Sequence, residues 1–393
     1  MMPVDEAMGR LLALAAPLPT EEVALAQAAG RWMAGPAVAQ RDQPPFDASA
    51  MDGYAIAGEA APGMVLAVTG TAGAGHGFAG RVGPGEAVRI FTGAPVPAGA
   101  SRVILQEDVT RQGDRITLGA AAGGGLNIRR RGQDFPAGAA LAPRRLAPAD
   151  LALIAAMNLP RIRCHRRPVV ALIATGDELV LPGEVPRADQ IVASNAYALK
   201  PMAEAEGAEV RLLPVARDSE AGLRAVFALA AGADVIVTIG GASVGDLDLV
   251  GKVAGEIGMD PAFWRIAMRP GKPLMAGRLG PSVMLGLPGN PVSAFVCAHL
   301  FLRPLLRALQ GDPAPVAEPR RARLAIAVEA NGPRTHFMRA RLGRDGSIAP
   351  FDRQDSALLT ILSEADSLLI RPPGDGPRSA GDMVGYLPLS HFS

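Results

Sequence analysis

In the stretch 167–311 the pattern of apolar and polar positions predicts apolar strands that alternate with amphipathic helices. Two apolar runs, 168–176 and 233–241, end in glycines and predict buried strands. The stretch 194–207 predicts an amphipathic helix between them, capped by Ser194 or Asn195, and Ser219 can cap another helix. Because strands and helices alternate along the chain, we expect a mainly parallel sheet covered by helices.

The end of this stretch predicts a strand, a stiff turn and a long helix. Asn290 stands where a helix N-cap is expected, and Pro291 stands at the first helical position. Proline is favoured there because its fixed φ suits a helix start, where its missing N–H costs nothing.

The flanking stretches follow other patterns. Short β-like pieces split by glycine and proline turns fill 54–142 and recur in 312–393, so we expect a small β domain and a compact C-terminal barrel or sandwich. The spacing within 4–15, 20–30 and 148–158 predicts helices. We therefore predict an α/β multidomain protein with the following parts: an N-terminal helical and linker domain in two pieces, 1–53 and 143–166; an inserted β domain, 54–142; an α/β domain, 167–311; and a C-terminal β domain, 312–393.

Composition narrows the possible partners. The chain has 393 residues, 49% of them hydrophobic and 20% charged, with a formal net charge of +1. A net charge so close to zero argues against a nucleic-acid partner, because proteins that bind nucleic acid usually carry strongly basic surfaces. Cys164 and Cys297 lie in apolar surroundings without CxxC spacing, which indicates buried free thiols rather than zinc ligands. Asp5 and Glu6 stand where a secretory signal has positive charge, and no apolar run reaches the roughly 18 residues of a membrane span, so we expect a cytoplasmic protein.

Three loops follow predicted strands at the edge where open α/β sheets bind ligands. The first carries Asp177 and Glu178 beside a glycine, although acids at the start of a helix also suit the helix dipole. The second is rich in glycines that let backbone N–H groups approach an anion. The third is a stiff double-proline turn, which suits a preformed ligand wall or a plain structural turn. The candidate residues of the second and third loops are Gly240, Gly241, Ser243, Gly245, Asp246 and Asp248, and Pro288, Gly289, Asn290 and Pro291.

A basic segment precedes the third loop. Arg265, Arg269 and Lys272 lie close together in sequence, and in an extended segment Arg265 and Arg269 project from one face. Guanidinium groups fixed in this way bind phosphate or another tetrahedral oxyanion well. A solvated basic face is the alternative.

Acids also occur in the first part of the chain. Asp52 lies in a long punctuated loop, Asp134 follows a run of arginines, and Thr92 provides a hydroxyl at a strand end. Carboxylate oxygens are ligands for Mg²⁺, and acids combined with arginines are the usual arrangement for cleaving phosphoanhydride-type bonds. The acids that could contribute are Asp52, Asp134, Glu178, Asp218, Asp246 and Asp248.

The order of these motifs resembles one family. FDASAMDGYA, RIFTGAPVP, RRRGQDF, ATGDEL, GGASVGDLD, FWRIAMRPGKP and LPGNPVSA are similar, in this order, to the motif series of the MoeA family, also found as the E domain of gephyrin. The resemblance implies a MogA-like three-layer α/β domain, an inserted small β domain, an N-terminal helical part and a C-terminal β barrel. It also implies homodimers whose site lies between the α/β domain of one subunit and the inserted region of the other.

The resemblance implies a molybdopterin molybdenumtransferase. Such an enzyme cleaves adenylylated molybdopterin with molybdate and Mg²⁺, releases AMP and leaves molybdenum on the dithiolene, and a MogA-type adenylyltransferase is the expected upstream partner. The positions that match the family's site are Asp52, Thr92, Asp134, Glu178, Asp218, Asp248, Pro288, Pro291, Arg339 and Ser356.

Roles follow as hypotheses. The 240–246 loop and the 288–291 turn would bind the pterin nucleotide, and Glu178, Asp218 and Asp248 would hold Mg²⁺. Arg265, Arg269 and Arg339 would meet phosphates or molybdate; family members often have lysines where this chain has Arg265 and Arg269. A pterin-binding scaffold without turnover and a molybdopterin adenylyltransferase remain as alternatives.

Overall fold

The computed structural model describes residues 1–241 and 249–389. Ser243, Gly245, Asp246 and Asp248 of the predicted glycine loop therefore lie outside the described residues. The chain divides into two compact units. The first comprises 1–21, 30–32 and 165–393, and the second comprises 22–29 and 33–164.

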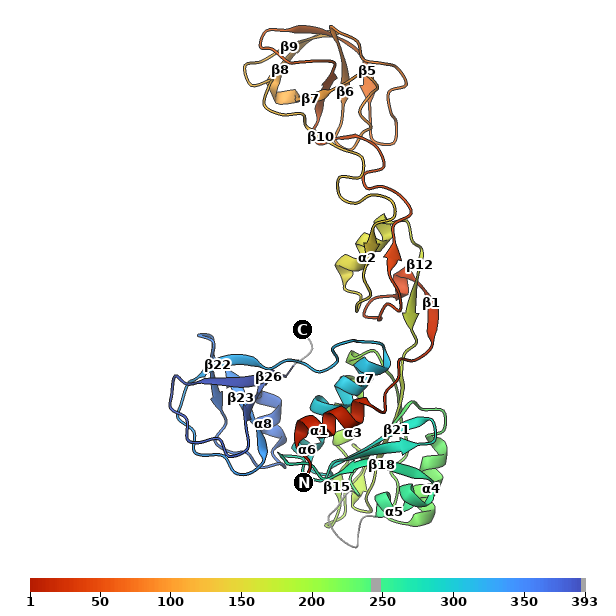
Figure 1. The fold of residues 1–393 in the computed structure, drawn as a ribbon, viewed down its shortest axis with the longest axis vertical. Coiled ribbons are helices and arrows are strands. Elements are labelled where there is room, and N and C mark those ends of the chain that lie inside the picture. The colour runs from red at the N-terminus through yellow and green to blue at the C-terminus, as the bar shows by residue number, and fades with distance from the viewer. Residues whose placement is uncertain (242–248, 390–393) are drawn as a thin grey trace. The chain divides into compact units, whose positions relative to one another are not determined.

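A six-stranded sheet forms the centre of the first unit, in the order β16-β13-β17-β21-β20-β18 (Figure 1). The first three strand pairings are parallel and the last two, of β20 with β21 and with β18, are antiparallel, so the predicted mainly parallel sheet is confirmed with an antiparallel edge. In sheet order the strands are β16 (Glu209–Leu212), β13 (Val169–Ala174), β17 (Val235–Ile239), β21 (Ser282–Leu287), β20 (Met275–Leu279) and β18 (Met259–Trp264).

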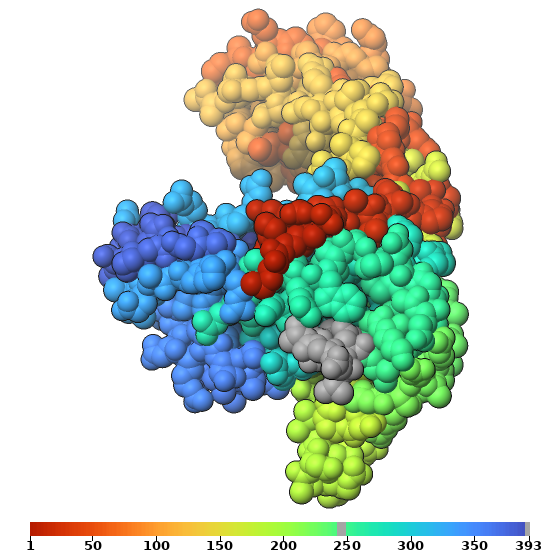
Figure 2. All heavy atoms as spheres, turned by 60° about the horizontal axis from the view of Figure 1, so that its bottom comes forward, coloured from red at the N-terminus to blue at the C-terminus, as the bar shows by residue number. Residues whose placement is uncertain are grey.

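Helices cover both faces of this sheet, because each central strand is apolar on both sides. Along β13, Val170 and Leu172 pack in one core, while Ala171 and Ile173 pack in the other. The first core includes residues of α1 (Val4–Leu12), α3 (Asn195–Ala205), α6 (Pro291–Cys297) and α7 (Arg303–Leu309), and the second includes residues of α4 (Glu220–Leu229) and α5 (Leu249–Glu256). In the space-filling view α1 lies on the surface of the α/β part (Figure 2). The three-layer domain is therefore present.

The helix that follows β21 is the longest apolar one in the described part of the chain. It begins with Pro291 after the N-cap Asn290, as predicted, and continues from α6 through the π-helical segment η3 (Ala298–Leu302) into α7. Residues Pro291–Leu309 are long and apolar enough to cross a membrane, but 72% of the stretch is buried inside the protein. It is therefore a core helix of the first unit.

The C-terminal part of the first unit is a closed barrel, as the resemblance implied. Its ring runs β23-β24-β22-β26-β25 and closes by pairing of β23 with β25. The strands are β22 (Arg320–Leu324), β23 (Thr335–Leu342), β24 (Ser347–Pro350), β25 (Ser367–Arg371) and β26 (Met383–Pro388), with α8 (Leu359–Glu364) between β24 and β25. A short strand from the α/β part, β19 (Met268–Arg269), extends this sheet by pairing with β23.

The second unit contains the predicted small β domain, a six-stranded sheet in the order β7-β4-β6-β5-β9-β8 (Figure 1). In chain order the strands are β4 (Gly53–Ile56), β5 (Val65–Ala72), β6 (Glu86–Ile90), β7 (Arg102–Leu105), β8 (Val109–Gln112) and β9 (Arg115–Leu118), with η2 (Gln106–Asp108) after β7. Two buried clusters fill it, one containing Ile56 and Ile116 and the other containing Val88 and Val103.

A separate small core surrounds α2 (Pro148–Ala156), the helix predicted for 148–158. The helix predicted for 20–30 is wrong: this stretch forms β1 (Thr20–Ala24), which pairs with β12 (Arg161–His165), and a 3₁₀ turn η1 (Leu25–Gln27). The remaining short strands are β2 (Ala37–Val38), β3 (Ala48–Ser49), β10 (Ile128–Arg129), β11 (Ala140–Leu141), β14 (Leu179–Val180) and β15 (Ile191–Val192).

Candidate active site

The predicted loops of the α/β domain meet at the carboxyl edge of its sheet. Ala174, Ile239 and Leu287, the last residues of β13, β17 and β21, are neighbours in register across three parallel strands. The loops that follow them enclose a cavity of about 680 Å³. Eight of the predicted site residues line it: Glu178, Asp218, Gly240, Gly241, Pro288, Gly289, Asn290 and Pro291.

Glu178 owes its position to Gly176. Gly176 has a φ of 145°, and a Cβ there would lie 2.4 Å from Oε2 of Glu178. Only glycine leaves room for the carboxylate to fold back over the turn. The Glu178 carboxylate has no hydrogen-bond partner among the described residues, so both of its oxygens can take a ligand.

A second loop brings Asp218 to the same cavity. The backbone N–H of Asp218 donates to Oδ1 of Asp177 at 3.2 Å, and Arg217 donates to the Asp177 carbonyl at 3.1 Å. Asp177 therefore fastens two loops together, while the exposed Asp218 carboxylate has no bond of its own to a described residue. The first loop thus divides its two acids between a structural and a ligand-facing position.

The double glycine is required by close packing. Gly240 has a φ of 97°, a Cβ there would lie 2.8 Å from the Thr175 carbonyl oxygen, and one on Gly241 would lie 2.2 Å from Cγ2 of Val250. The N–H of Gly240 already donates to the carbonyl of Leu287 at 3.0 Å. An anion could therefore not use that N–H, contrary to the reason given for this glycine from the sequence.

The proline turn is held by a residue that sequence reasoning assigned only to a helix start. Nδ2 of Asn195 donates to the Gly289 carbonyl at 2.7 Å, and Ser194 and Asn195 both line the cavity. The signal available in the sequence was a Ser-Asn pair before a helix, and it predicted a cap. No side-chain cap bond forms at Ser194, and the Asn195 side chain bonds the proline turn.

The basic segment does not form one strand. β18 ends at Trp264, Arg265 adopts a left-handed φ of 65°, and Arg269 lies in β19 of another sheet. The expectation that Arg265 and Arg269 project from one face of a strand is therefore wrong. Arg265 and Arg269 are exposed and form no ion pair with the described residues, while Lys272 is half-buried next to Pro273, which lines the cavity.

Arg339 and Ser356 occupy supporting positions. Arg339 is 1% exposed, and its guanidinium donates to the Asp355 carbonyl at 2.9 Å and to Oε1 of Gln354 at 3.3 Å. The Ser356 carbonyl accepts the N–H of Val292 at 3.0 Å, next to Ala357 in the cavity wall. In this arrangement Arg339 stabilises the loop that carries Ser356 from a buried position.

The remaining predicted acids lie in the second unit. Oδ1 of Asp52 accepts both the backbone N–H of Thr92 at 2.7 Å and its hydroxyl at 2.8 Å. The bond from the Thr92 backbone lowers the pKa of Asp52 most, followed by the bond from the Thr92 hydroxyl. The positive charge of Arg89 lowers this pKa further, so that it lies below its usual range. Asp134 is exposed, and its N–H donates to the Gln43 carbonyl at 2.9 Å.

Arginines fasten the loop around Asp52 to the rest of the second unit. Asp47 accepts Nη1 of Arg130 at 2.6 Å and the N–H of Arg131 at 2.9 Å, and the latter bond chiefly lowers the pKa of Asp47. Asp42 accepts Nε of Arg131 and the N–H of Ala137. The arginine run that the sequence suggested for anions is thus partly used to hold this loop.

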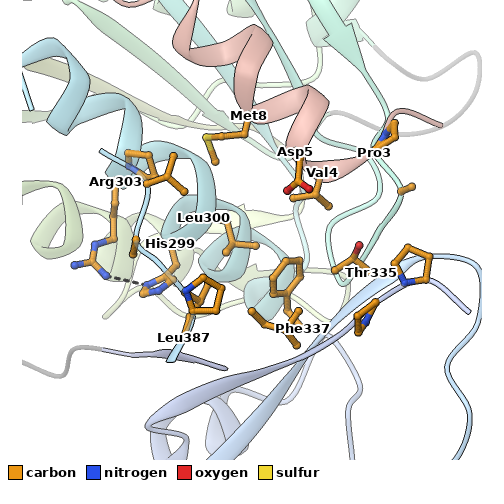
Figure 3. Close-up of a pocket in the computed structure, with 18 of the residues that line it drawn as sticks. Pro3, Val4, Asp5, Met8, His299, Leu300, Arg303, Thr335, Phe337 and Leu387 are labelled. Carbon is orange, nitrogen blue, oxygen red and sulfur yellow. Dashed lines mark hydrogen bonds between the residues drawn. The ribbon is translucent and has the colours of Figure 1, made fainter. Parts of the chain in front are cut away.

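A second cavity, of about 770 Å³, has different chemistry (Figure 3). Met8, Leu300, Phe337 and Leu387 give it an apolar wall, and Asp5 is its one described carboxylate. At its edge Arg303 donates to Nδ1 of His299 at 3.0 Å, and burial lowers the pKa of His299 to about 3. With a single acid, this cavity does not fit the predicted chemistry as well as the sheet-edge cavity does.

The sheet-edge cavity can accommodate Mg²⁺. No group of three acid, histidine or cysteine side chains gathers in the parts of the chain that the structure describes. Glu178 and Asp218 nevertheless line one cavity without a cationic partner. Mg²⁺ is commonly held by one or two carboxylates together with water and substrate phosphates, so this pair suits it.

Comparisons with known proteins agree along the whole chain. Residues 2–158 match the MoeA N-terminal region (domain I and II), 171–308 match a probable molybdopterin binding domain, and 321–389 match the MoeA C-terminal region (domain IV). A molybdopterin molybdenumtransferase of Haemophilus influenzae is 34% identical over 403 residues, covering 100% of both chains. One of Nostoc is 33% identical over 391 residues, covering 94% of this chain and 89% of that one.

A solved structure agrees with the fold. The crystal structure of a molybdopterin biosynthesis MoeA protein from Pyrococcus horikoshii has a TM-score of 0.84 and 30% identity, and the match covers 100% of each chain. The match therefore extends over both units and the barrel. The chain belongs to the MoeA family.

Proposed function

We propose that this protein is a molybdopterin molybdenumtransferase, which inserts molybdenum from molybdate into molybdopterin during molybdenum cofactor biosynthesis. The relatives with 33–34% identity over almost the whole chain bear this name. The observation that carries the proposal is the meeting of Glu178, Asp218, the double glycine and the proline turn in one cavity. An acid-lined, glycine-walled site at the carboxyl edge of a parallel sheet suits a nucleotide-linked, anionic substrate.

The substrate proposed is adenylylated molybdopterin, which would be cleaved with release of AMP. Its pterin nucleotide would lie against Gly241 and the 288–291 turn, where a preformed wall reduces the entropy lost on binding. Arg265 and Arg269, exposed and unpaired in the described structure, would meet molybdate or phosphate oxygens. Orientation and charge neutralisation would supply the rate enhancement, and no protein nucleophile is required.

Mg²⁺ is the proposed cofactor, held by Glu178 and Asp218, with Asp248 outside the described residues as the third expected ligand. When bound, it would neutralise charge on phosphate oxygens. Without it, two carboxylates and an anionic substrate would repel one another in the same cavity. Arg217 and Asp177 bond the two loops to each other, which supports the proposal that the ligand oxygens would be positioned before substrate binds.

The other finer points are proposals of the same kind. Asp52, Thr92 and Asp134 of the second unit would complete the site in a homodimer, each cavity taking them from the partner subunit. A MogA-type adenylyltransferase would supply the substrate, in the cytoplasm. The pairing of Asp52 with Thr92, which holds an ionised carboxylate at a strand end, supports a shared role for these two residues.

Glu178→Gln tests the proposal. The change keeps the shape of a side chain that has no described bonds, so we expect an unchanged melting temperature and loss of AMP release from adenylylated molybdopterin with molybdate and Mg²⁺. The control is Glu318→Gln, at an exposed position away from the cavity lining. Retained turnover in the Glu178 variant would remove this carboxylate from the mechanism.

The two alternatives need separate assays. Incubation with ATP and molybdopterin detects adenylylation, and incubation with adenylylated molybdopterin and molybdate detects insertion. A pterin-binding scaffold would bind the pterin in both assays and release no product in either. AMP release in the second assay alone is the outcome expected here.

A further inference from the structure

Arg89 lies at the centre of the contacts that fix Asp52 and Thr92. We propose that Arg89 is a positioning residue for molybdenum insertion, which holds this pair in a fixed orientation. The inference rests on the proposed role of Asp52 in the reaction. All the residues that carry it belong to the small β domain of the second unit.

The Arg89 guanidinium lies against two aromatic rings. Its central carbon is 5.0 Å from the ring centre of Tyr54 and 4.9 Å from that of Phe91. Tyr54 faces Arg89 across the β4–β6 pair and is buried, while Phe91 is 40% exposed and directly precedes Thr92. A planar guanidinium stacks on such rings, whereas a lysine ammonium provides only a point charge.

The same guanidinium holds the backbone that follows Asp52, both directly and through Gln106. Nη1 donates to the Gly53 carbonyl at 3.2 Å, and Nη2 donates to Oε1 of Gln106 at 2.5 Å. The N–H of Gln106 in turn donates to the carbonyl of Asp52 at 3.1 Å. Arg89 therefore contacts Gly53, which follows Asp52, and Phe91, which precedes Thr92. It also contacts Gln106, whose N–H bonds the Asp52 carbonyl.

This arrangement leaves one oxygen of Asp52 available. Thr92 uses only Oδ1, and Oδ2 has no hydrogen-bond partner in the described parts of the chain. The charged groups on the elements packed around Asp52 are Glu86 and Arg89 on β6, Arg102 on β7, and Glu107 and Asp108 on η2. Glu86 accepts the N–H of Gly83 in its own turn. Of these, Arg89 stabilises the ionised carboxylate, after the two bonds from Thr92. Asp52 thus presents an ionised oxygen in a defined direction.

Arg89→Gln and Arg89→Lys test this role, with Arg111→Gln as the control. Arg111 is an exposed arginine of the same domain, bonded to the Gly113 carbonyl of its own turn. We expect Arg89→Gln to lower turnover roughly 10- to 100-fold, as loss of a supporting partner of a functional group does. The acid limb of its pH–rate profile should move to higher pH, because Asp52 then protonates more easily. Arg89→Lys should restore the acid limb but only part of the rate.

Asp52→Asn separates this inference from the proposed function. If it abolishes AMP release while Arg89→Gln keeps the wild-type rate and pH profile, the role of Arg89 is overturned and the proposed function stands. Normal turnover by Asp52→Asn overturns the role of Asp52 and this inference with it. If Arg89→Gln fails to fold, the ¹³C-carboxyl signal of Asp52 in Arg89→Lys and wild type decides: a displaced Asp52 chemical shift together with a reduced rate supports the inference, and an unchanged shift or an unchanged rate overturns it.

Discussion

Gly176 shows how a single residue without a side chain can determine the position of a carboxylate in the proposed site. A Cβ at this position would meet Glu178 at 2.4 Å and would also face a φ of 145°. We expect Gly176→Ala to displace the Glu178 carboxylate and to abolish molybdate-dependent AMP release. The backbone strain should in addition cost about 1–3 kcal/mol of unfolding free energy, measurable by denaturant titration.

Gly183→Ala is the matched control for that variant. Gly183 also has a left-handed φ, 96°, but no atom lies within 4 Å of a Cβ there. Gly183→Ala should therefore lose about as much unfolding free energy as Gly176→Ala and keep its activity. Equal activity losses in both variants would mean that strain, and not the Glu178 contact, explains the effect.

At the scale of elements, a buried ion cluster joins α3 to α7. Glu206, 2% exposed at the end of α3, accepts Nε of Arg303 at 2.6 Å and Nε of Arg307 at 2.8 Å. Burial raises the pKa of Glu206, but the bonds and charges of the two arginines outweigh it and leave the pKa below the usual 4.5. The cluster thus keeps its carboxylate ionised inside the core.

Glu206→Gln should therefore destabilise the first unit by about 3–5 kcal/mol, because it leaves two arginines without their carboxylate. Since the pKa of Glu206 is lowered in the folded protein, its contribution to the free energy of unfolding is complete above pH 4.5. This contribution is lost as the pH falls below 4.5 and through the lowered folded pKa. Unfolding free energy measured against pH should show a weaker decline at acid pH in the variant than in wild type. Glu364→Gln, in an exposed pair with Arg341, should change stability by less than about 1 kcal/mol.

The short elements also show where sequence patterns are insufficient. The stretch 20–30 has helical spacing, yet it forms β1 and a 3₁₀ turn, because β12 offers a strand partner distant in sequence. Arg269 similarly joins a barrel strand instead of continuing β18. Local propensity differs by a few tenths of a kcal/mol per residue, so a distant pairing partner can override it.

At the scale of the whole molecule, the proposed site takes acids from two subunits. Asp52→Asn and Glu178→Gln should each be inactive alone. Mixed in equal amounts and allowed to exchange subunits, they should recover about a quarter of wild-type activity, because half of the dimers are mixed and each has one intact site. AMP release before and after exchange is the measurement.

The mixing experiment distinguishes the arrangements of the site. If Asp52 and Glu178 of one chain served the same site, every site in the mixture would carry a substitution and no activity would return. A mixture of two Glu178→Gln preparations is the control, and it should remain inactive. Activity that does not depend on exchange would also contradict the shared site.

The sequence by itself determined the α/β alternation, the two β domains, the helix start at Pro291 and the loops that carry Glu178, the double glycine and the proline turn. These features are local, since they depend on periodicity and on glycine or proline at positions with special backbone angles. Only the tertiary structure decided that Asp177 is structural while Glu178 bonds no described residue through its side chain, that Arg339 is buried, and that Asn195 holds Gly289. Such roles depend on contacts between residues far apart in the chain, and no local pattern encodes which partner a side chain will meet.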